Sequence, residues 1–142
     1  MSYNYKREND VIGQRPIDST LDYFVGEMLY VDSVSFLYKN DIDDTKAANF
    51  AGVSLDQVPV SGIGDRDADK NGIAVARKGV FKFKTTVADV YHQGALVYVG
   101  ADANTVSVTG TNAIGRAQMP AMATAVTGAV GVYIDVEIAA VK

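Results

Sequence analysis

The sequence predicts an all-β protein, folded as a small β-barrel or sandwich. The clearest evidence is the segment 132–138, which alternates strictly between branched apolar side chains and other residues, the period of a half-buried strand. Similar short apolar segments recur along the chain between Gly, Asn or Asp residues, and no long apolar helical stripe competes with them. Roughly eight or nine short strands at such spacing are typical of a closed or nearly closed barrel, or of a sandwich.

The expected strands begin after residue 27. Residues 28–31 and 34–38, with a turn at Asp32 and Ser33, are predicted to form a hairpin. Residues 96–99 are apolar on both faces, which is typical of an interior or interface strand. The other expected strands are 50–55, 73–77, 80–84, 105–109 and 132–138, and the apolar segment 113–117 leads into a small-residue stretch.

Two features of the later part of the chain leave alternatives open. Residues 86–93 could hold at most one short helix, with Val87, Val90 and Tyr91 on one side. Charged residues become sparse after residue 85, where Ala, Val and Thr dominate. These small residues either form a core or provide a surface that meets other subunits.

The first 26 residues differ in composition from the rest, so we divide the chain into an N-terminal arm, 1–26, and a β-rich body, 27–142. The arm is rich in charge of both signs, and its apolar residues are scattered. Either it is a partly disordered terminus, or it orders on a partner surface. Tyr3 and Tyr5 would share one face of a strand added to the edge of a partner sheet. The arm residues expected to contact a partner are Tyr3, Tyr5, Val11, Ile12 and Ile17.

Composition narrows the function classes. The 142-residue chain is 48% apolar and carries a formal net charge of −4, which argues against a generic nucleic-acid binder. It has no cysteine, so disulfides and thiolate metal sites are excluded. The polar start has no apolar signal core, and no run approaches the ~18 apolar residues of a membrane helix. We therefore expect a soluble protein made in a cytoplasm and without a membrane partner.

One acidic segment, 65–72, invites comparison with a calcium loop. Four of its residues match positions one, three, five and six of an EF-hand: Asp67, Asp69, Asn71 and Gly72. The twelfth position is Lys78 rather than a bidentate Glu, and no helical pattern flanks the segment. Because Asp, Asn and Gly also favour ordinary turns, a surface loop is the preferred interpretation, and ion binding stays open.

Catalytic patterns are otherwise missing from the sequence. His92 is the only histidine and precedes Gly94 in an expected loop, and no Gly-x-Ser-x-Gly nucleophile elbow occurs. Lys82 and Lys84 alternate with aromatic residues, a pattern that suits either a nucleic-acid-binding sheet or a half-buried strand with the lysines outside. The half-buried strand needs fewer assumptions. We therefore expect no catalytic residues, no cofactor and no resident metal.

Several segments together resemble a family of small tailed-phage head proteins, the capsid decoration or cement proteins, filed as a domain of unknown function. The resemblance spans roughly residues 26 to 141 and lies in the order and spacing of short strands. The family usually has an acidic residue where this chain has Ala95. The segments that carry the resemblance are 50–55, 78–81, 94–99, 112–117 and 132–138.

This resemblance implies a non-enzymatic structural protein of the virion with a β-tulip-like body. Such a protein is made in the host cytoplasm and docks on the outside of the expanded phage capsid, often as homotrimers at local three-fold positions. It clamps neighbouring major capsid subunits, and its amino-terminal arm provides part of the grip. The alternatives are another virion component, such as a head fibre base or tail accessory protein, a small hydrolase or sugar-binding module using His92, and a nucleic-acid binder.

Overall fold

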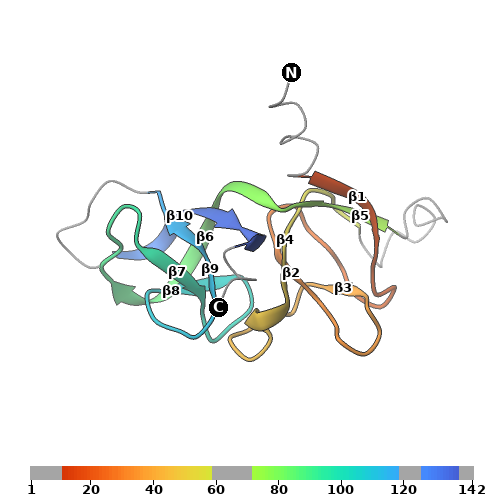
Figure 1. Ribbon diagram of the computed structural model, residues 1–142, viewed down its shortest axis with the longest axis horizontal. Coiled ribbons are helices and arrows are strands. Elements are labelled where there is room, and N and C mark those ends of the chain that lie inside the picture. Colours follow the sequence, from red (N-terminus) through yellow and green to blue (C-terminus); the bar gives the residue numbers. More distant parts are fainter. Residues whose placement is uncertain (1–10, 59–71, 119–125, 138–142) are drawn as a thin grey trace, which may run out of the picture.

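The computed structural model describes residues 11–58, 72–118 and 126–137, and the structural statements below concern these residues. They form two β lobes that lie side by side, a five-stranded sheet and a closed five-stranded barrel (Figure 1). This arrangement confirms the all-β class, and a closed barrel is one of the two forms that the sequence predicted. A short 3₁₀ turn, η1 (Ala47–Asn49), precedes one of the strands. Within the described ranges, no helix is long and apolar enough to cross a membrane.

The first lobe is an antiparallel sheet in the order β1-β5-β4-β2-β3. A single parallel bridge between Ile17 and Tyr38 brings the chain that follows β1 back to β3, so the two edges of the sheet approach one another. The strands are β1 (Val11–Pro16), β2 (Met28–Val31), β3 (Tyr38–Lys39), β4 (Phe50–Ser54) and β5 (Gly72–Ala76).

The second lobe closes in the order β10-β6-β8-β7-β9, with β9 pairing again with β10. Most of its pairs are antiparallel, but β6 and β8 run parallel, with Lys84 opposite Thr105. The strands are β6 (Lys78–Asp89), β7 (Leu96–Val99), β8 (Thr105–Ser107), β9 (Ala113–Ala117) and β10 (Val126–Asp135).

The main core is shared by the two lobes. Met28 and Phe50 of the first sheet belong to the same buried cluster as Phe83, Ile114 and Ile134 of the barrel. Because apolar burial is the main favourable term in folding, this common cluster fixes the lobes against each other. A second, smaller cluster lies within the first lobe and contains Ile17, Tyr23, Leu29, Val58, Ile73 and Val75.

Burial along β10 confirms the alternation predicted for its sequence. Val132, Ile134 and Val136 are buried, whereas Glu137 is exposed. The last apolar residue of the predicted stripe, Ile138, lies outside the described residues. The strand begins earlier than expected, at residue 126, and pairs with almost the whole length of β6.

The hairpin prediction was wrong in its second strand, and the short helix that residues 86–93 could hold does not form. The hairpin exists, but its second strand covers only Tyr38–Lys39, and residues 32–37 form a loop. No helix forms over residues 86–93, because β6 continues through Asp89 and pairs there with Val126 of β10. The extended backbone satisfies its hydrogen-bonding groups in this ladder, so a helix would gain nothing there.

The boundary predicted at residue 26 also needs correction. β1 pairs with β5, Ile17 is buried, and Tyr23 is fully buried. The Tyr23 backbone exchanges two hydrogen bonds with Val58, with N···O distances of 3.0 and 2.9 Å. Residues 11–26 therefore belong to the folded body, because their scattered apolar residues are brought together by distant strands rather than by a local period.

Candidate functional site

The five predicted arm residues have different environments. Tyr3 and Tyr5 lie outside the described residues. Val11 is exposed at the start of β1, and Ile12 is half-buried and lines a cleft. Ile17 packs in the smaller core, where its role is structural. A partner contact by the arm stays a prediction for Tyr3, Tyr5, Val11 and Ile12.

The other sequence candidates do not gather into a reaction centre in the described part of the chain. His92 is exposed in the turn after β6, where its carbonyl accepts a hydrogen bond from the Ala95 amide at 2.9 Å. Residues 65–71 of the possible calcium loop lie outside the described residues, and Gly72 begins β5. Among the described residues, no three His, Asp or Glu side chains are grouped so as to hold a metal ion.

The basic and aromatic residues of β6 take the alternation of a half-buried strand. Lys82 and Lys84 are exposed, Phe83 is buried, and Phe81 is half-buried. The phenylalanines therefore serve the barrel core, where Phe83 belongs to the main cluster and Phe81 packs against it. Base stacking, which a nucleic-acid-binding sheet would need, requires exposed rings.

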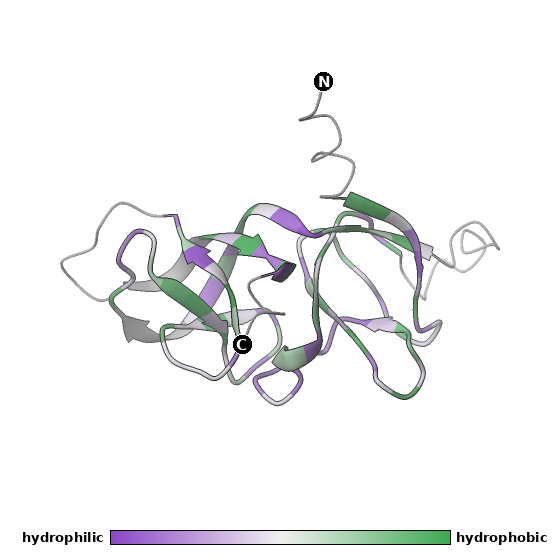
Figure 2. Cartoon of the chain, in the orientation of Figure 1, coloured by the Kyte–Doolittle hydropathy of each residue, from purple (hydrophilic) through white to green (hydrophobic). Residues whose placement is uncertain are grey.

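The most conspicuous exposed apolar feature is the loop 32–37 between β2 and β3. Val34 is 86% exposed and Phe36 is 68% exposed, and we call these two side chains the apolar tip. Figure 2 shows hydrophobic colour on this loop, at the end of the first lobe away from the barrel. Single exposed apolar residues are common, but two neighbouring ones in a well-formed loop are a candidate contact surface.

Hydrogen bonds hold this loop in one conformation. The Asp32 carboxylate accepts hydrogen bonds from the backbone N–H groups of Val34, at 2.8 Å, and Ser35, at 3.2 Å. The Phe36 amide donates to the Asp32 carbonyl at 2.8 Å, and the Asp32 amide donates to the Leu37 carbonyl at 2.9 Å. Phe36 has a φ of 61°, which costs a bulky residue free energy and requires support from its surroundings. The tip is therefore preorganised.

An ionic cluster anchors the base of the same loop. The Lys39 Nζ lies 3.1 Å from the Asp32 carboxylate and 3.7 Å from that of Asp18. Hydrogen bonds from Val34 and Ser35, with Lys39 adding to them, lower the pKa of Asp32. The hydrogen bond with Asp32 raises the pKa of Lys39. Both groups therefore remain charged over a wide pH range around neutrality.

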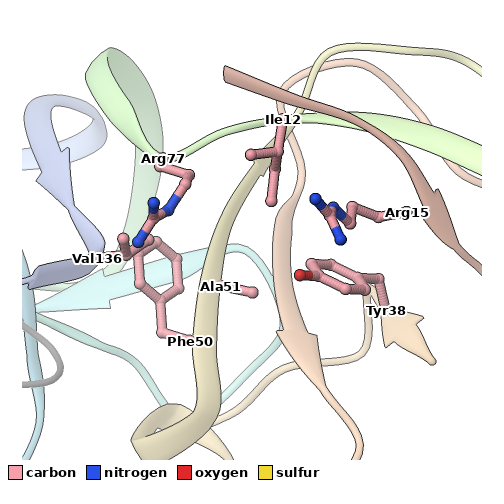
Figure 3. Close-up of a pocket in the computed structure, with 7 residues that line it drawn as sticks. All are labelled: Ile12, Arg15, Tyr38, Phe50, Ala51, Arg77 and Val136. Atoms are coloured by element: carbon pink, nitrogen blue, oxygen red, sulfur yellow. The ribbon is translucent and has the colours of Figure 1, made fainter. Parts of the chain in front are cut away.

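A cleft of about 440 Å³ opens where the two lobes meet (Figure 3). The Arg15 guanidinium lies beside Tyr38, the Arg77 guanidinium lies beside Phe50 and Val136, and Ile12 lies between the two arginines. Its walls come from β1, β3, β4, the β5–β6 connection and the residue after β10. We call it the arginine cleft, and its lining residues are Ile12, Arg15, Tyr38, Phe50, Ala51, Arg77 and Val136.

Neither the apolar tip nor the arginine cleft was predicted from the sequence. Val34, Phe36 and Tyr38 recur at every second position, and this period predicts a strand. The available signal was Asp32 with Ser33 and Ser35 close behind it, since these residues favour local turns through side-chain hydrogen bonds. Arg15 and Arg77 are 62 positions apart, and only the fold brings them to one cleft.

Comparisons with protein-family models, with curated proteins and with solved structures gave no match for this chain.

Proposed function

We propose that this chain is a structural protein of a tailed-phage virion that docks on the outside of the capsid and links neighbouring major capsid subunits. The observation that carries the proposal is the preorganised apolar tip formed by Val34 and Phe36. A rigid loop with exposed apolar side chains loses little conformational entropy on binding, which favours an adhesive role. The assignment to a virion comes from the resemblance of the sequence to capsid decoration proteins in the order and spacing of short predicted strands.

The architecture suits a protein that makes many copies of the same weak contact with a capsid surface. The shared core makes the two lobes one solid body, so contacts made by both lobes act together. On a capsid the same contact recurs many times, and a standard interface of ~1,600 Å² or less in each copy would restrain the shell. We further propose that Tyr3 and Tyr5 add an arm contact and that copies associate as homotrimers on the shell.

The first test measures binding of the purified chain to capsids of the phage that encodes it, prepared without this chain. We expect the wild-type protein to sediment with these capsids and to delay their thermal disruption. Cryo-electron microscopy of the complex would locate it on the outer surface. Absence of the chain from heads, or its presence at a tail or fibre, would refute the proposal and favour the alternative virion component.

The second test removes the apolar tip by Phe36→Asn. Asn adopts positive φ more readily than Phe, so this change keeps the loop conformation and removes the ring. Burial of a Phe side chain contributes about 1.5–3 kcal/mol, so we expect affinity for capsids to fall by about 10- to 100-fold. Val80→Thr is the matched control, because Val80 is 58% exposed on the barrel. Equal binding by Phe36→Asn and wild type would exclude the tip from the interface.

The arm is tested by a truncation of residues 1–10, which leaves β1 intact. A longer truncation of residues 1–20 would also remove β1 and the buried Ile17, and it would confuse loss of binding with loss of folding. We expect the shorter truncation to lower capsid occupancy while leaving the urea midpoint of unfolding unchanged. Undiminished occupancy would remove the arm from the mechanism.

A further inference from the structure

We propose that the arginine cleft is a docking site for an acidic segment of a partner protein. This inference rests on the proposed function only for the partner's identity, which would then be a capsid subunit. The observation behind it is that two arginine side chains line one cleft, and that no acidic side chain lines it.

Neither arginine is neutralised within the described part of the chain. The four ion pairs found there all use lysine, namely Lys39 twice, Lys46 and Lys78. The third described arginine, Arg116, donates to the Gly94 carbonyl at 2.9 Å. In a chain with more acidic than basic residues, two unpaired guanidinium groups in one cleft are an unusual concentration of positive charge. They complement a ligand that carries carboxylates.

The surroundings of the arginines favour a peptide segment over a bare anion. Ile12, Phe50 and Val136 place apolar side chains in the same cleft, and Tyr38 adds a ring with a hydroxyl group. A peptide with an apolar side chain between two carboxylates would cover the apolar side chains of the cleft. Its carboxylates would bind the two guanidinium groups. Arginine is suited to this role because its planar fork binds carboxylates through two parallel hydrogen bonds.

The cleft is also anchored well enough to act as a fixed receptor. Val136 donates its amide hydrogen to the Arg77 carbonyl at 3.1 Å, which joins the end of β10 to the β5–β6 connection. Phe50 belongs to the core that both lobes share. Nucleic acid fits less well, because two cations on an acidic chain do not provide the run of phosphate contacts that such binding needs.

The test uses the full chain and a blocked five-residue peptide, Asp-Ser-Leu-Ser-Glu, whose two carboxylates and leucine lie on one face when the peptide is extended. Binding is followed by NMR of the arginine Nε–H signals and by titration calorimetry. We expect shifts at Arg15 and Arg77, at least tenfold weaker binding of the peptide's asparagine–glutamine counterpart, and weaker binding in high salt. Equal binding of the two peptides, no binding of the acidic one, or equally tight binding of inorganic phosphate or a DNA oligomer would overturn the proposal.

Variants separate this inference from the proposed function. Arg15→Gln with Arg77→Gln should weaken peptide binding and capsid binding at least tenfold, and the two Arg→Lys changes should weaken them less. Lys82→Gln with Lys84→Gln is the matched control, since it removes two exposed positive charges from the barrel. The urea midpoint of each variant reports whether its fold is intact. If the double Gln variant of the two arginines binds capsids as tightly as wild type, the cleft is not the docking site, and the proposed function is unaffected. If the chain binds the peptide through its arginines but does not bind capsids, the proposed function is refuted and the cleft inference stands.

Discussion

Closure of the barrel depends on the absence of a side chain at Gly115. This residue lies in β9 opposite Ile134 of β10 and is buried. A Cβ atom at Gly115 would lie 2.0 Å from the Tyr133 carbonyl oxygen and 2.8 Å from the Ile134 Cα. Both atoms are backbone, so they cannot rotate away as the end of a side chain can. We therefore predict that Gly115→Ala destabilises the protein by forcing β9 and β10 apart.

The size of this effect follows from the missing space. Ordinary van der Waals contact begins at 3.4 Å, so the 2.0 Å approach falls short of it by 1.4 Å. Overpacking usually costs about 1–3 kcal/mol, and a clash with backbone belongs at the upper end of that range. We expect a loss of about 3 kcal/mol in the free energy of unfolding. For a chain of this length, that corresponds to a fall in melting temperature of roughly 10 °C.

Gly131→Ala provides the matched control, because nothing lies within 4 Å of the Cβ position at Gly131. This glycine is also in a barrel strand, β10, and like Gly115 it does not have a positive φ. Urea and thermal unfolding followed by circular dichroism measure both variants. We expect Gly131→Ala to stay within about 0.5 kcal/mol of wild type or to be slightly more stable. Equal stability of the two alanine variants would refute the reasoning.

Two further predictions concern hydrogen bonds. Because the pKa of Asp32 is lowered, its carboxylate stabilises the folded loop at pH values above the ordinary aspartate pKa of 3.8. This stabilisation is lost as the pH falls through the pKa of the folded state. The NMR amide shifts of Val34 and Ser35 should therefore titrate with a midpoint below 3.8, and a midpoint at or above 3.8 would contradict the geometry. The buried Tyr91 hydroxyl lies 3.0 Å from the Thr85 Oγ1 and 3.2 Å from the Val106 carbonyl oxygen. Tyr91→Phe should cost about 1 kcal/mol in urea unfolding, and an unchanged midpoint would show that these bonds contribute no net stability.

The sequence predicts strands best where the side-chain period and burial agree. In β10 and β6 the apolar positions recur every second residue and face the main core. The same rule failed at residues 34–38, because Val34, Phe36 and Tyr38 have the strand period but Asp32 captures the backbone amides of the turn. An alternating pattern shows that one face is apolar, and it does not show that anything covers this face.

Long-range pairing was beyond the reach of sequence patterns. β6 pairs in parallel with β8, and Ile17 forms a bridge with Tyr38. The local sequence of each segment does not predict which segment it pairs with. The same holds for β1, whose residues Val11–Pro16 lack an apolar alternation and become a strand because β5 offers an edge. The arginine cleft takes residues from β1 and β3 and so depends on the pairing of β1 with β5 and on the bridge from Ile17 to Tyr38, and it could be found only in the fold.

The shared core has a consequence for how the two candidate surfaces would act. The apolar tip belongs to the first lobe, and the arginine cleft lies where this lobe meets the barrel. Because Met28 and Phe50 pack in one cluster with Phe83 and Ile134, the separation between the two surfaces is fixed. A partner that engages one surface is then held at a high effective concentration near the other. Two weak contacts can therefore act as one strong attachment, and disrupting the common core at Met28 or Ile134, which line neither surface, should weaken both together.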